Sequence, residues 1–342
     1  RGGGSGHGDG TGHGAGMRAA LARFRESLEA QRAPPPRRLS EEERLALWRD
    51  GFVVVPGAVG EAACDAALRA INRSLGQNSS DRRPGEACPE LKDDPAILGL
   101  FLRSSVKDLV RDAVGPIHRV GGAQVALRFP GDGCFNGFQV APHWDQHWHL
   151  DGLAAPGNPY TRAGELHNFT ALVGVLLSNV GEDYCGNLTV FPGSHLALQH
   201  WFQRNGFEAV RALGVQGLPR PQEVPFPRRV EMVKGRKGDA VIVNYSVAHL
   251  VAPNVSSAIR YCCYFRVHTK DHVQPFRSHR PEAMLDVWRD WRGMRGIDQL
   301  ERALELSRRE GAGARAQGPP AQSRADEDAE LQLALEISRV EQ

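Results

Sequence analysis

Histidine and aspartate residues gather in one short segment of the sequence. Residues 141–152 read APHWDQHWHLDG and contain two His-x-Asp units, His143–Asp145 and His149–Asp151. In an extended strand, side chains two positions apart lie on one face, so the histidine and aspartate of either unit could bind one metal ion. The chain contains 13 histidines, and about one such tripeptide is expected by chance in a chain of this composition. The segment by itself is therefore a weak signal for a metal site.

A third histidine and an arginine follow much later in the chain. Residues 238–249 read GDAVIVNYSVAH, which predicts a Gly-Asp turn leading into a buried strand that ends at His249. The run IRYCCYF over residues 259–265 predicts the next strand and places Arg260 inside it. An arginine buried in a strand needs an anionic partner. That partner is either a structural carboxylate or the carboxylate of a bound ligand, which a guanidinium group binds with two hydrogen bonds.

Two histidines and one carboxylate on one face form the facial triad of non-haem Fe(II) oxygenases. A carboxylate-binding arginine one strand away suggests a 2-oxoglutarate co-substrate. With these motifs the sequence resembles the phytanoyl-CoA dioxygenase family over roughly residues 39–293. Further segments that carry the resemblance are DGFVVVPG at 50–57, HLDG at 149–152 and GNLTVFPGSH at 186–195.

The resemblance implies a mainly β fold with flanking helices, a double-stranded β-helix (jelly roll). It implies that His149, Asp151 and His249 hold Fe(II) and that Arg260 binds the distal carboxylate of 2-oxoglutarate. The expected activity is a dioxygenase reaction that hydroxylates a small organic or lipid-like substrate. His149 and Asp151 are favoured as the ligand pair because Gly152 follows them, but His143 and Asp145 stay open as the alternative pair.

Two further residues near these motifs have open roles. His195 ends the Pro-Gly-Ser-His turn, where a structural histidine that bonds to the local backbone is favoured over a fourth metal ligand. Arg128 lies in a predicted strand, and it either faces the site or lies in solvent at a sheet edge.

The surrounding pattern predicts the elements that must position these residues. Ser40 and Glu43 form a capping box for a helix that runs to about Asp50 and is ended by Gly51. Helical patterns are expected over 59–75, 104–114, 196–213 and 281–291. Strands are expected over 52–55, 124–129, 169–177, 188–191, 229–233, 240–245 and 259–267. Many short strands with long loops are typical of a sandwich, jelly roll or barrel.

The composition excludes several classes of protein. The 342 residues carry 42 Lys and Arg against 40 Asp and Glu, a net charge of +2, which gives no reason to expect a nucleic-acid partner. The apolar runs are shorter than the ~20 residues of a membrane span. Six cysteines without a C-x-x-C pair indicate free thiols. We therefore expect an intracellular, cytoplasmic protein, and a removed targeting sequence stays open because the chain begins with Arg1.

The two ends of the chain differ from the middle in composition. Residues 1–38 are rich in Gly and Pro and predict a disordered head with one short helix. Residues 294–342 predict a helical tail, with helices over 298–310 and 326–341 that share the frame Leu-x-x-Ala-x-x-x-Ser-x-x-Glu. The frame residues are Leu300, Ala303 and Ser307 in the first copy and Leu331, Ala334 and Ser338 in the second.

This repeated frame resembles the ubiquitin-interacting motif, which implies that the tail binds ubiquitin or a ubiquitinated protein. The second copy has the acidic residues that precede the frame, at 326–328 and 330, whereas the first copy largely lacks them. The alternative is a pair of amphipathic helices that pack on the domain or on each other.

Two other functions compete with the 2-oxoglutarate-dependent enzyme. One is an iron oxygenase that does not use 2-oxoglutarate, which Arg260 argues against. The other is a catalytically silent jelly-roll adaptor that binds ubiquitin, which the intact set of His149, Asp151, His249 and Arg260 argues against. The substrate itself is not predicted by any motif.

Overall fold

A computed structural model of the chain describes residues 36–77, 87–134, 148–154, 161–162, 164–209, 224, 226, 230–272 and 280–301. The chain divides into two units, residues 1–37 and 38–342, and all the described helices and strands belong to the second. Residues 1–35 of the predicted disordered head and most of the predicted tail, from residue 302 onward, lie outside the described residues.

The larger of two β-sheets has five antiparallel strands in the order β1-β6-β3-β8-β2. These strands are β1 (Phe52–Val55), β2 (Gln124–Arg128), β3 (Ala171–Leu176), β6 (Ala240–Asn244) and β8 (Arg260–Val267). Strand β1 has the bounds that the sequence predicts. The ends of the other four strands lie within one or two residues of the predicted ends. The predicted strands of this sheet are therefore confirmed.

The smaller sheet has three antiparallel strands in the order β5-β4-β7. They are β4 (Leu188–Val190), β5 (Glu231–Met232) and β7 (His249–Val251). From β3 onward the chain passes repeatedly from the larger sheet to the smaller one and back, as the positions of β3, β4, β6, β7 and β8 show. This alternation between two facing antiparallel sheets is the jelly roll that the sequence predicts.

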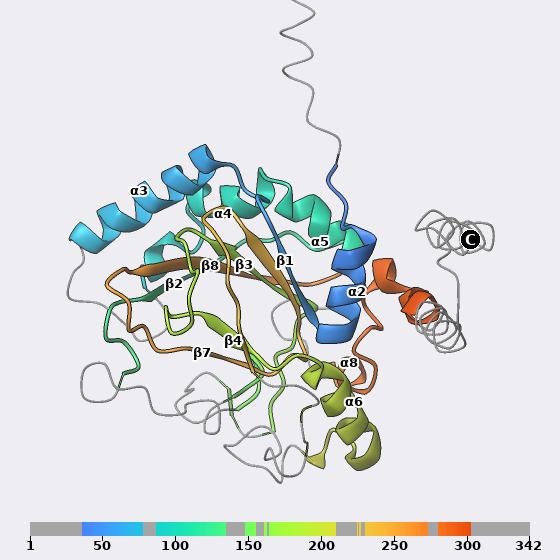
Figure 1. The fold of residues 1–342 in the computed structure, drawn as a ribbon. Helices are drawn as coiled ribbons and strands as arrows, with labels where there is room; N and C mark the ends of the chain where they lie inside the picture. The colour runs from blue at the N-terminus through green and yellow to red at the C-terminus, as the bar shows by residue number, and fades with distance from the viewer. Residues whose placement is uncertain are drawn as a thin grey trace, which may run out of the picture. The chain divides into compact units, whose positions relative to one another are not determined.

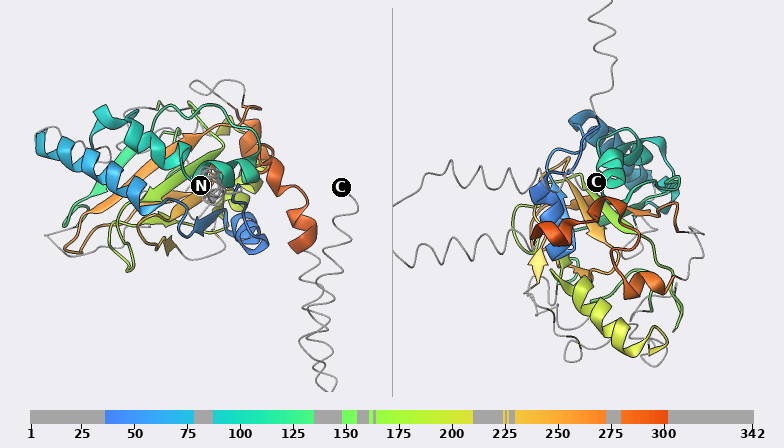
Figure 2. Two further views of the ribbon diagram at one scale, coloured as in Figure 1. Left: turned by 90° about the horizontal axis from the view of Figure 1, so that it is seen from above. Right: turned by 90° about the vertical axis from the view of Figure 1, so that its right-hand side faces the viewer.

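Helices cover the outer face of the larger sheet (Figures 1 and 2). They are α3 (Glu61–Gln77), α4 (Pro95–Leu102) and α5 (Val106–Val114). Their buried apolar side chains pack on the outward residues of the strands, as where Phe101 of α4 meets Phe265 of β8 with ring centroids 5.3 Å apart. Helix α4 was not among the predicted helices; Asp94 caps it by accepting hydrogen bonds from the amides of Ala96 and Ile97.

The inner faces of the two sheets enclose a second apolar cluster. Leu172 and Val243 from the larger sheet meet Val190 and Leu250 from the smaller sheet in this cluster. Because strand side chains alternate between faces, Val173 of β3 packs instead among the helices on the outer face. The alternation divides the apolar residues between the space under the helices and the space between the sheets.

The first helix, α2 (Glu41–Asp50), begins and ends as predicted. Ser40 accepts a hydrogen bond from the Glu43 amide, and the Glu43 side chain accepts one from the Ser40 amide. Gly51 ends the helix at φ +81°, where a Cβ atom would lie 2.4 Å from Val247 and 2.6 Å from His195. Only glycine fits both this left-handed backbone and this close approach.

Three sequence predictions about element ends are wrong. The helix expected over 196–213 is one, since α6 (Ser194–Asn205) ends before Gly206. Strand β6 ends at Asn244, within one residue of the strand expected over 240–245, but it does not run on to His249 as the pattern of residues 238–249 predicts; His249 instead begins β7 in the other sheet. Asn244 forms the turn between them, because its side-chain oxygen accepts a hydrogen bond from the Ser246 amide. The helix expected over 281–291 is also shorter, since α8 spans Glu282–Leu285 and Asp286 is already extended.

Four further features complete the described unit. They are α6 (Ser194–Asn205), the 3₁₀ turns Pro89–Leu91 and Arg292–Met294, and a helical stretch over residues 297–301. All six cysteines are free thiols, as the sequence indicates. Among the described helices, none combines the length and apolar character needed to cross a lipid bilayer.

Candidate metal centre

The structure brings His149, Asp151 and His249 together. Their candidate ligand atoms all lie within 4.8 Å of one another. The Nε2 atoms of His149 and His249 lie 3.6 Å and 3.7 Å from Oδ1 of Asp151. Two imidazole nitrogens and one carboxylate oxygen at this spacing can bind a single transition-metal ion.

A backbone bridge holds the two histidines in place. His149 pairs with His249 in an isolated antiparallel bridge, in which each amide donates to the other carbonyl, at 3.0 Å and 3.1 Å. The bridge attaches the segment that contains His149 to β7 at the edge of the smaller sheet. Residues that face each other in such a bridge project their side chains to the same side, and the two ring centroids lie 4.7 Å apart.

The tautomer of His249 suits metal binding. Its Nδ1 lies 2.9 Å from the backbone oxygen of Val247, to which Nδ1–H donates. This bond leaves the lone pair of Nε2 on the side that faces Asp151. A metal-binding histidine is commonly oriented by such a hydrogen bond on its other ring nitrogen.

Arg266 fixes the orientation of the Asp151 carboxylate. Its Nε and Nη2 donate to the same oxygen, Oδ2, at 3.1 Å and 2.7 Å. The other oxygen, Oδ1, is then the one turned toward both histidines. Arg266 itself is held by Gln124, whose side-chain oxygen accepts from Nη2 at 3.0 Å, and by the Phe169 ring, 5.9 Å from the guanidinium carbon.

The electrostatic surroundings keep Asp151 ionised. Burial raises the pKa of this carboxyl, but Arg266, His149 and His249 outweigh burial and hold the pKa well below its usual range. An ionised carboxylate is the form that binds a metal ion.

The centre opens to solvent on one side. The His149 side chain is 34% exposed, whereas the side chains of Asp151 and His249 are 18% and 8% exposed. Of the three side chains, solvent therefore reaches His149 most.

Gly152 is required by the turn that follows the ligand pair. It has φ +75°, and a Cβ atom on it would lie 2.1 Å from the carbonyl oxygen of His167. The Gly152 carbonyl in turn accepts a hydrogen bond from the His167 amide. The glycine of the His-x-Asp-Gly motif thus allows the chain to turn directly after Asp151.

Arg260 lies at the other end of the inward face of β8. It is 5% exposed, and its Nε and Nη1 donate to the carbonyls of Gly186 and Ala126, at 2.7 Å and 3.0 Å. Within the described part of the chain, no carboxylate forms an ion pair with Arg260. A structural carboxylate, one of the two partners that the sequence allows, is therefore not found among the described residues.

Tyr264 lies between Arg260 and the three-residue cluster. Arg260, Cys262, Tyr264 and Arg266 alternate along β8 and share its inward face. Burial and the neighbouring Cys262 raise the pKa of the Tyr264 phenol, and the charges of both Arg260 and Asp151 act on it. Arg260 and the cluster thus face the same interior space between the sheets.

Arg128 faces Arg260 directly across the β2–β8 pair. Burial and the Arg260 charge lower the pKa of Arg128, while Asp132 opposes them. Its side chain is half-buried, so neither of the two predicted positions, in the site or in open solvent, describes it fully. The two arginines make this end of the interior strongly cationic.

His195 is a structural residue, as the sequence favours. Its Nε2 bonds to the carbonyl oxygen of Trp48 at 3.0 Å, which joins α6 to α2. The side chain is fully buried, and burial lowers its pKa to about 4 against the opposing effects of Trp48 and Asp50. It belongs to the packing of the fold and not to the three-residue cluster.

Several predicted site residues lie outside the described residues. They are His143 and Asp145 of the alternative ligand pair, and Ala303, Ser307, Leu331, Ala334 and Ser338 of the tail motifs. Leu300 is described and is half-buried in the helical stretch at residues 297–301.

Arg266 is not among the site residues that the sequence predicts. Its only sequence signal is its spacing from Arg260, since two arginines six positions apart in one strand share a face. Its partner Asp151 is 115 positions away in the sequence, which no local pattern reveals.

The phytanoyl-CoA dioxygenase (PhyH) family model matches residues 47–262. This range covers more than half of the chain and includes His149, Asp151, His249 and Arg260. A comparison with curated protein sequences gave no match.

Three solved structures illustrate the similarity to known folds. SnoK from nogalamycin biosynthesis, a non-haem alpha-ketoglutarate-dependent carbocyclase, is 19% identical, with 68% of this chain and 84% of that chain covered and a TM-score of 0.46. HygX from Streptomyces hygroscopicus, with nickel and 2-oxoglutarate bound, is 19% identical, with coverage of 68% and 88% and a TM-score of 0.44. The epimerase SnoN, in complex with Fe3+, alpha ketoglutarate and nogalamycin RO, is 21% identical, with coverage of 67% and 83% and a TM-score of 0.45.

Replacing Arg266 with Gln should weaken binding of a divalent metal. Asp151 then loses the two donors that orient its carboxylate, and loss of such an outer partner typically lowers metal affinity by about 10–100-fold. Titration calorimetry with Co²⁺, an air-stable probe, measures the effect. R266K should lose less metal affinity than R266Q. R69Q, which changes an exposed arginine on α3, should bind Co²⁺ as tightly as the wild type does. Equal affinity in R266Q and the wild type would contradict the role of Arg266.

The stability of the protein should fall as the pH is lowered from about 6.5 to about 4, in part because of His195. The folded protein holds this imidazole neutral with a pKa of about 4, whereas in the unfolded chain it takes up a proton near pH 6.5. Because of this difference in pKa, the free energy of unfolding should be about 2 kcal/mol lower at pH 5 than at pH 7. Urea unfolding at both pH values measures it. H195Q keeps a donor for Trp48 but does not titrate, so its stability should change less between the two pH values; an identical change would sink this explanation.

Proposed function

The chain belongs to the phytanoyl-CoA dioxygenase family, and we propose that it is an Fe(II)- and 2-oxoglutarate-dependent dioxygenase that hydroxylates a small organic or lipid-like substrate. One observation carries the proposal: His149, Asp151 and His249 converge on one point in the interior of a jelly roll whose strand β8 presents Arg260 from the same face. Family membership supports the chemistry, and the residues needed for it are all present within the matched range.

The donor set fits iron. Two neutral imidazoles and one carboxylate leave three positions of an octahedral ion open, as the facial triad of Fe(II) oxygenases does. Oδ1 of Asp151 and the Nε2 atoms of both histidines are the atoms that would hold the ion. Bound Fe(II) would supply the site at which dioxygen and 2-oxoglutarate react, so that decarboxylation of the co-substrate is coupled to oxidation of the substrate.

Arg260 is the residue proposed to bind the co-substrate. It is buried, it keeps N–H groups beyond its two backbone bonds, and it has no carboxylate partner among the described residues. A carboxylate of 2-oxoglutarate would supply the missing negative charge, bound through two hydrogen bonds. This arrangement favours the 2-oxoglutarate-dependent enzyme over an iron oxygenase without that co-substrate.

The remaining work of the protein is to orient and shield the reactants. The interior between Arg260 and the metal centre is lined by Tyr264 and closed by the apolar cluster between the sheets. Exclusion of water strengthens the bond between a guanidinium and a carboxylate. The exposed side of His149 leaves room for the substrate to approach.

The protein should release carbon dioxide from carboxyl-labelled 2-oxoglutarate in the presence of Fe(II). Substitution of Arg260 tests the co-substrate site: R260A should raise the KM for 2-oxoglutarate by about 10-fold or more, since loss of one charged hydrogen bond costs about 1.5–3 kcal/mol, while metal binding is retained. R103A, on the exposed end of α4, is the matched control. No release from iron-loaded protein would support the catalytically silent adaptor, and iron-dependent oxidation without release would support the iron-only oxygenase.

The iron content of two further variants tests which His-x-Asp pair holds the metal. H149A should lose Fe(II) binding, and H143A should keep it. The opposite result would identify His143 and Asp145 as the ligands.

For the tail, we propose ubiquitin binding through the second copy of the repeated frame, supported by its sequence alone. Ala334 is the small residue of that frame, and a large side chain there would block close approach of a partner surface. A334R in the full chain should lower the affinity for ubiquitin by at least about 10-fold, measured by NMR titration of labelled ubiquitin. A321R, outside the frame, should have no effect. Absence of ubiquitin binding by the wild type would leave the alternative of packed amphipathic helices.

A further inference from the structure

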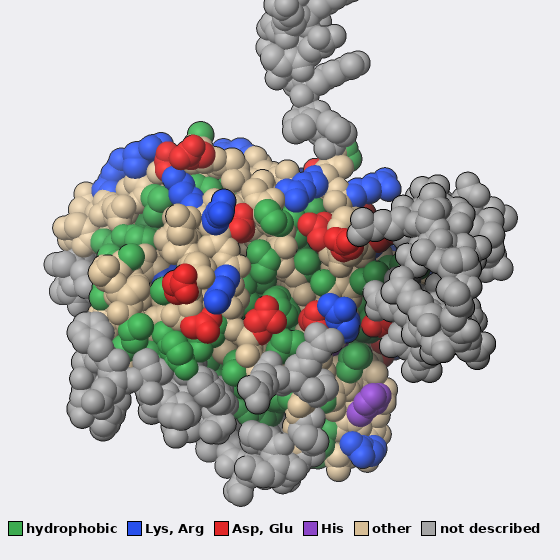
Figure 3. Space-filling view, in the orientation of Figure 1, with side chains coloured by type: hydrophobic (Ala, Val, Ile, Leu, Met, Phe, Trp, Pro, Cys, Tyr) green, Lys and Arg blue, Asp and Glu red, His purple; other side chains and the backbone are tan. Residues whose placement is uncertain are grey.

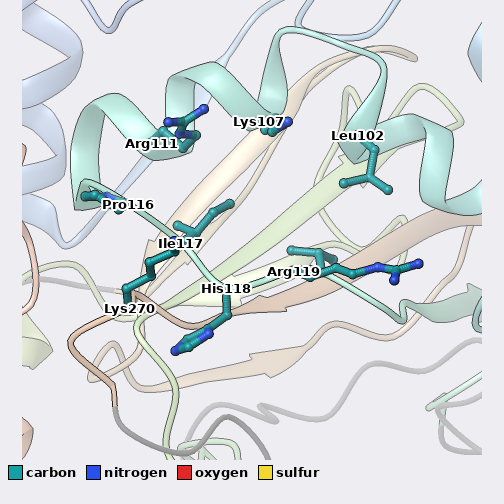
Figure 4. A pocket seen from close by; sticks show the side chains of 9 residues that line it. Leu102, Lys107, Arg111, Pro116, Ile117, His118, Arg119 and Lys270 are labelled. Atoms are coloured by element: carbon teal, nitrogen blue, oxygen red, sulfur yellow. The ribbon is translucent and has the colours of Figure 1, made fainter.

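A cavity of about 370 Å³ lies on the helix side of the molecule, where α4 and α5 meet the segment that leads into β2 (Figure 4). Four of its nine lining residues carry a full positive charge, Lys107, Arg111, Arg119 and Lys270, and none is acidic. No lining residue belongs to the metal centre. The cavity is therefore a separate feature of the fold.

The cationic side chains come from both walls of the cavity. Lys107 and Arg111 are one turn apart on α5, and Arg119 and Lys270 lie across from them (Figure 4). The second wall is held together by backbone contacts, since the Lys270 amide donates to the Pro116 carbonyl at 2.9 Å and Ile117 forms a bridge with Thr269. His118 points away from α5 and bonds through Nε2 to the His272 carbonyl.

The four charges have no counter-charge in the described part of the chain. None of these side chains forms an ion pair or hydrogen bond with another described residue. The two acidic residues of α5 do not neutralise these charges, because Asp112 forms an ion pair with Arg44 and Asp108 does not line the cavity. On the face shown in Figure 3, by contrast, acidic and basic side chains are interspersed.

The space between the charges is apolar. Leu102, one of the few large apolar side chains of the described surface that is exposed (39%), lies on one side, and Ile117 lies opposite it. The volume is at the lower end of the ~300–1,000 Å³ of small-molecule sites, so a folded macromolecule cannot fill it. Arg111, Arg119 and Lys270 are exposed and Lys107 is half-buried, so solvent partly screens the repulsion among the four charges, and a bound anion would relieve it further.

We infer that this cavity binds a small organic molecule that carries two or more phosphate groups. The phosphates lie among Lys107, Arg111, Arg119 and Lys270, and the organic part contacts Leu102 and Ile117. Lysine and arginine are the side chains that bind phosphate groups most strongly. The site is independent of the proposed oxygenase reaction, because it shares no residue with the metal centre.

Calorimetric titration of the full chain with ADP and with inorganic pyrophosphate tests the inference. The H249A background removes the metal centre as a competing site for phosphate. Both probes should bind, ADP more tightly because of its organic part, and the affinity should fall as salt is raised. The double variant K107A/R119A should lose at least about 10-fold in affinity, and K270A alone should lose less. R73A, an exposed arginine on α3, should bind as the parent does.

Three results would overturn the inference. They are no binding of either probe at millimolar concentration, unchanged affinity in K107A/R119A and K270A, and binding that disappears in H249A, which would place the phosphates at the metal centre. Flotation with phosphatidylserine-containing vesicles tests for a membrane ligand. If the protein binds these vesicles but neither small probe, and if the substitutions weaken vesicle binding, then the cavity binds a membrane surface and the inference is wrong. Circular dichroism of K107A/R119A and K270A checks that the variants are folded.

Discussion

The backbone bridge between His149 and His249 is the contact on which the metal centre depends. It joins segments a hundred positions apart with two hydrogen bonds, of 3.0 Å and 3.1 Å. Because side chains alternate along a strand, a shift of one residue in this pairing would turn one imidazole to the opposite face. In the observed register both rings point the same way, and Asp151, two positions after His149, completes the set of three.

The inward face of β8 carries positively charged side chains into the jelly roll, and these need negatively charged or polar partners. This strand carries an arginine near each end, of which Arg260 is buried and Arg266 is 40% exposed. A buried guanidinium is stable only when its donors find acceptors. At one end Arg266 meets the carboxylate of Asp151 and orients it. At the other end Arg260 meets only backbone carbonyls among the described residues, beside a second arginine at position 128. The two ends thus suit different tasks, ligand orientation and anion binding.

Local sequence signals predicted much of the fold. The Ser40–Glu43 capping box and Gly51 placed both ends of α2, because capping depends on residues within one turn. The β-branched runs placed the strands of the larger sheet for a similar reason. The expectation of a strand that runs to His249 failed, because β6 ends at Asn244 although the apolar sequence continues through the turn to Val247 and Ala248. There the side-chain bond of Asn244 to the Ser246 amide, and the space between two sheets, decide where the chain changes direction.

The sequence by itself determined which residue types are available for the site: the His-x-Asp-Gly segment, the later histidine and the arginine in the strand after it. It also determined the mainly β character, because strand periodicity is a local property. Only the tertiary structure decided that Arg266 holds Asp151, that Arg260 lacks a carboxylate partner in the described part of the chain, and that four cationic side chains line one cavity. These relations join residues far apart in the sequence, and they exist only after the two sheets and the helices have packed.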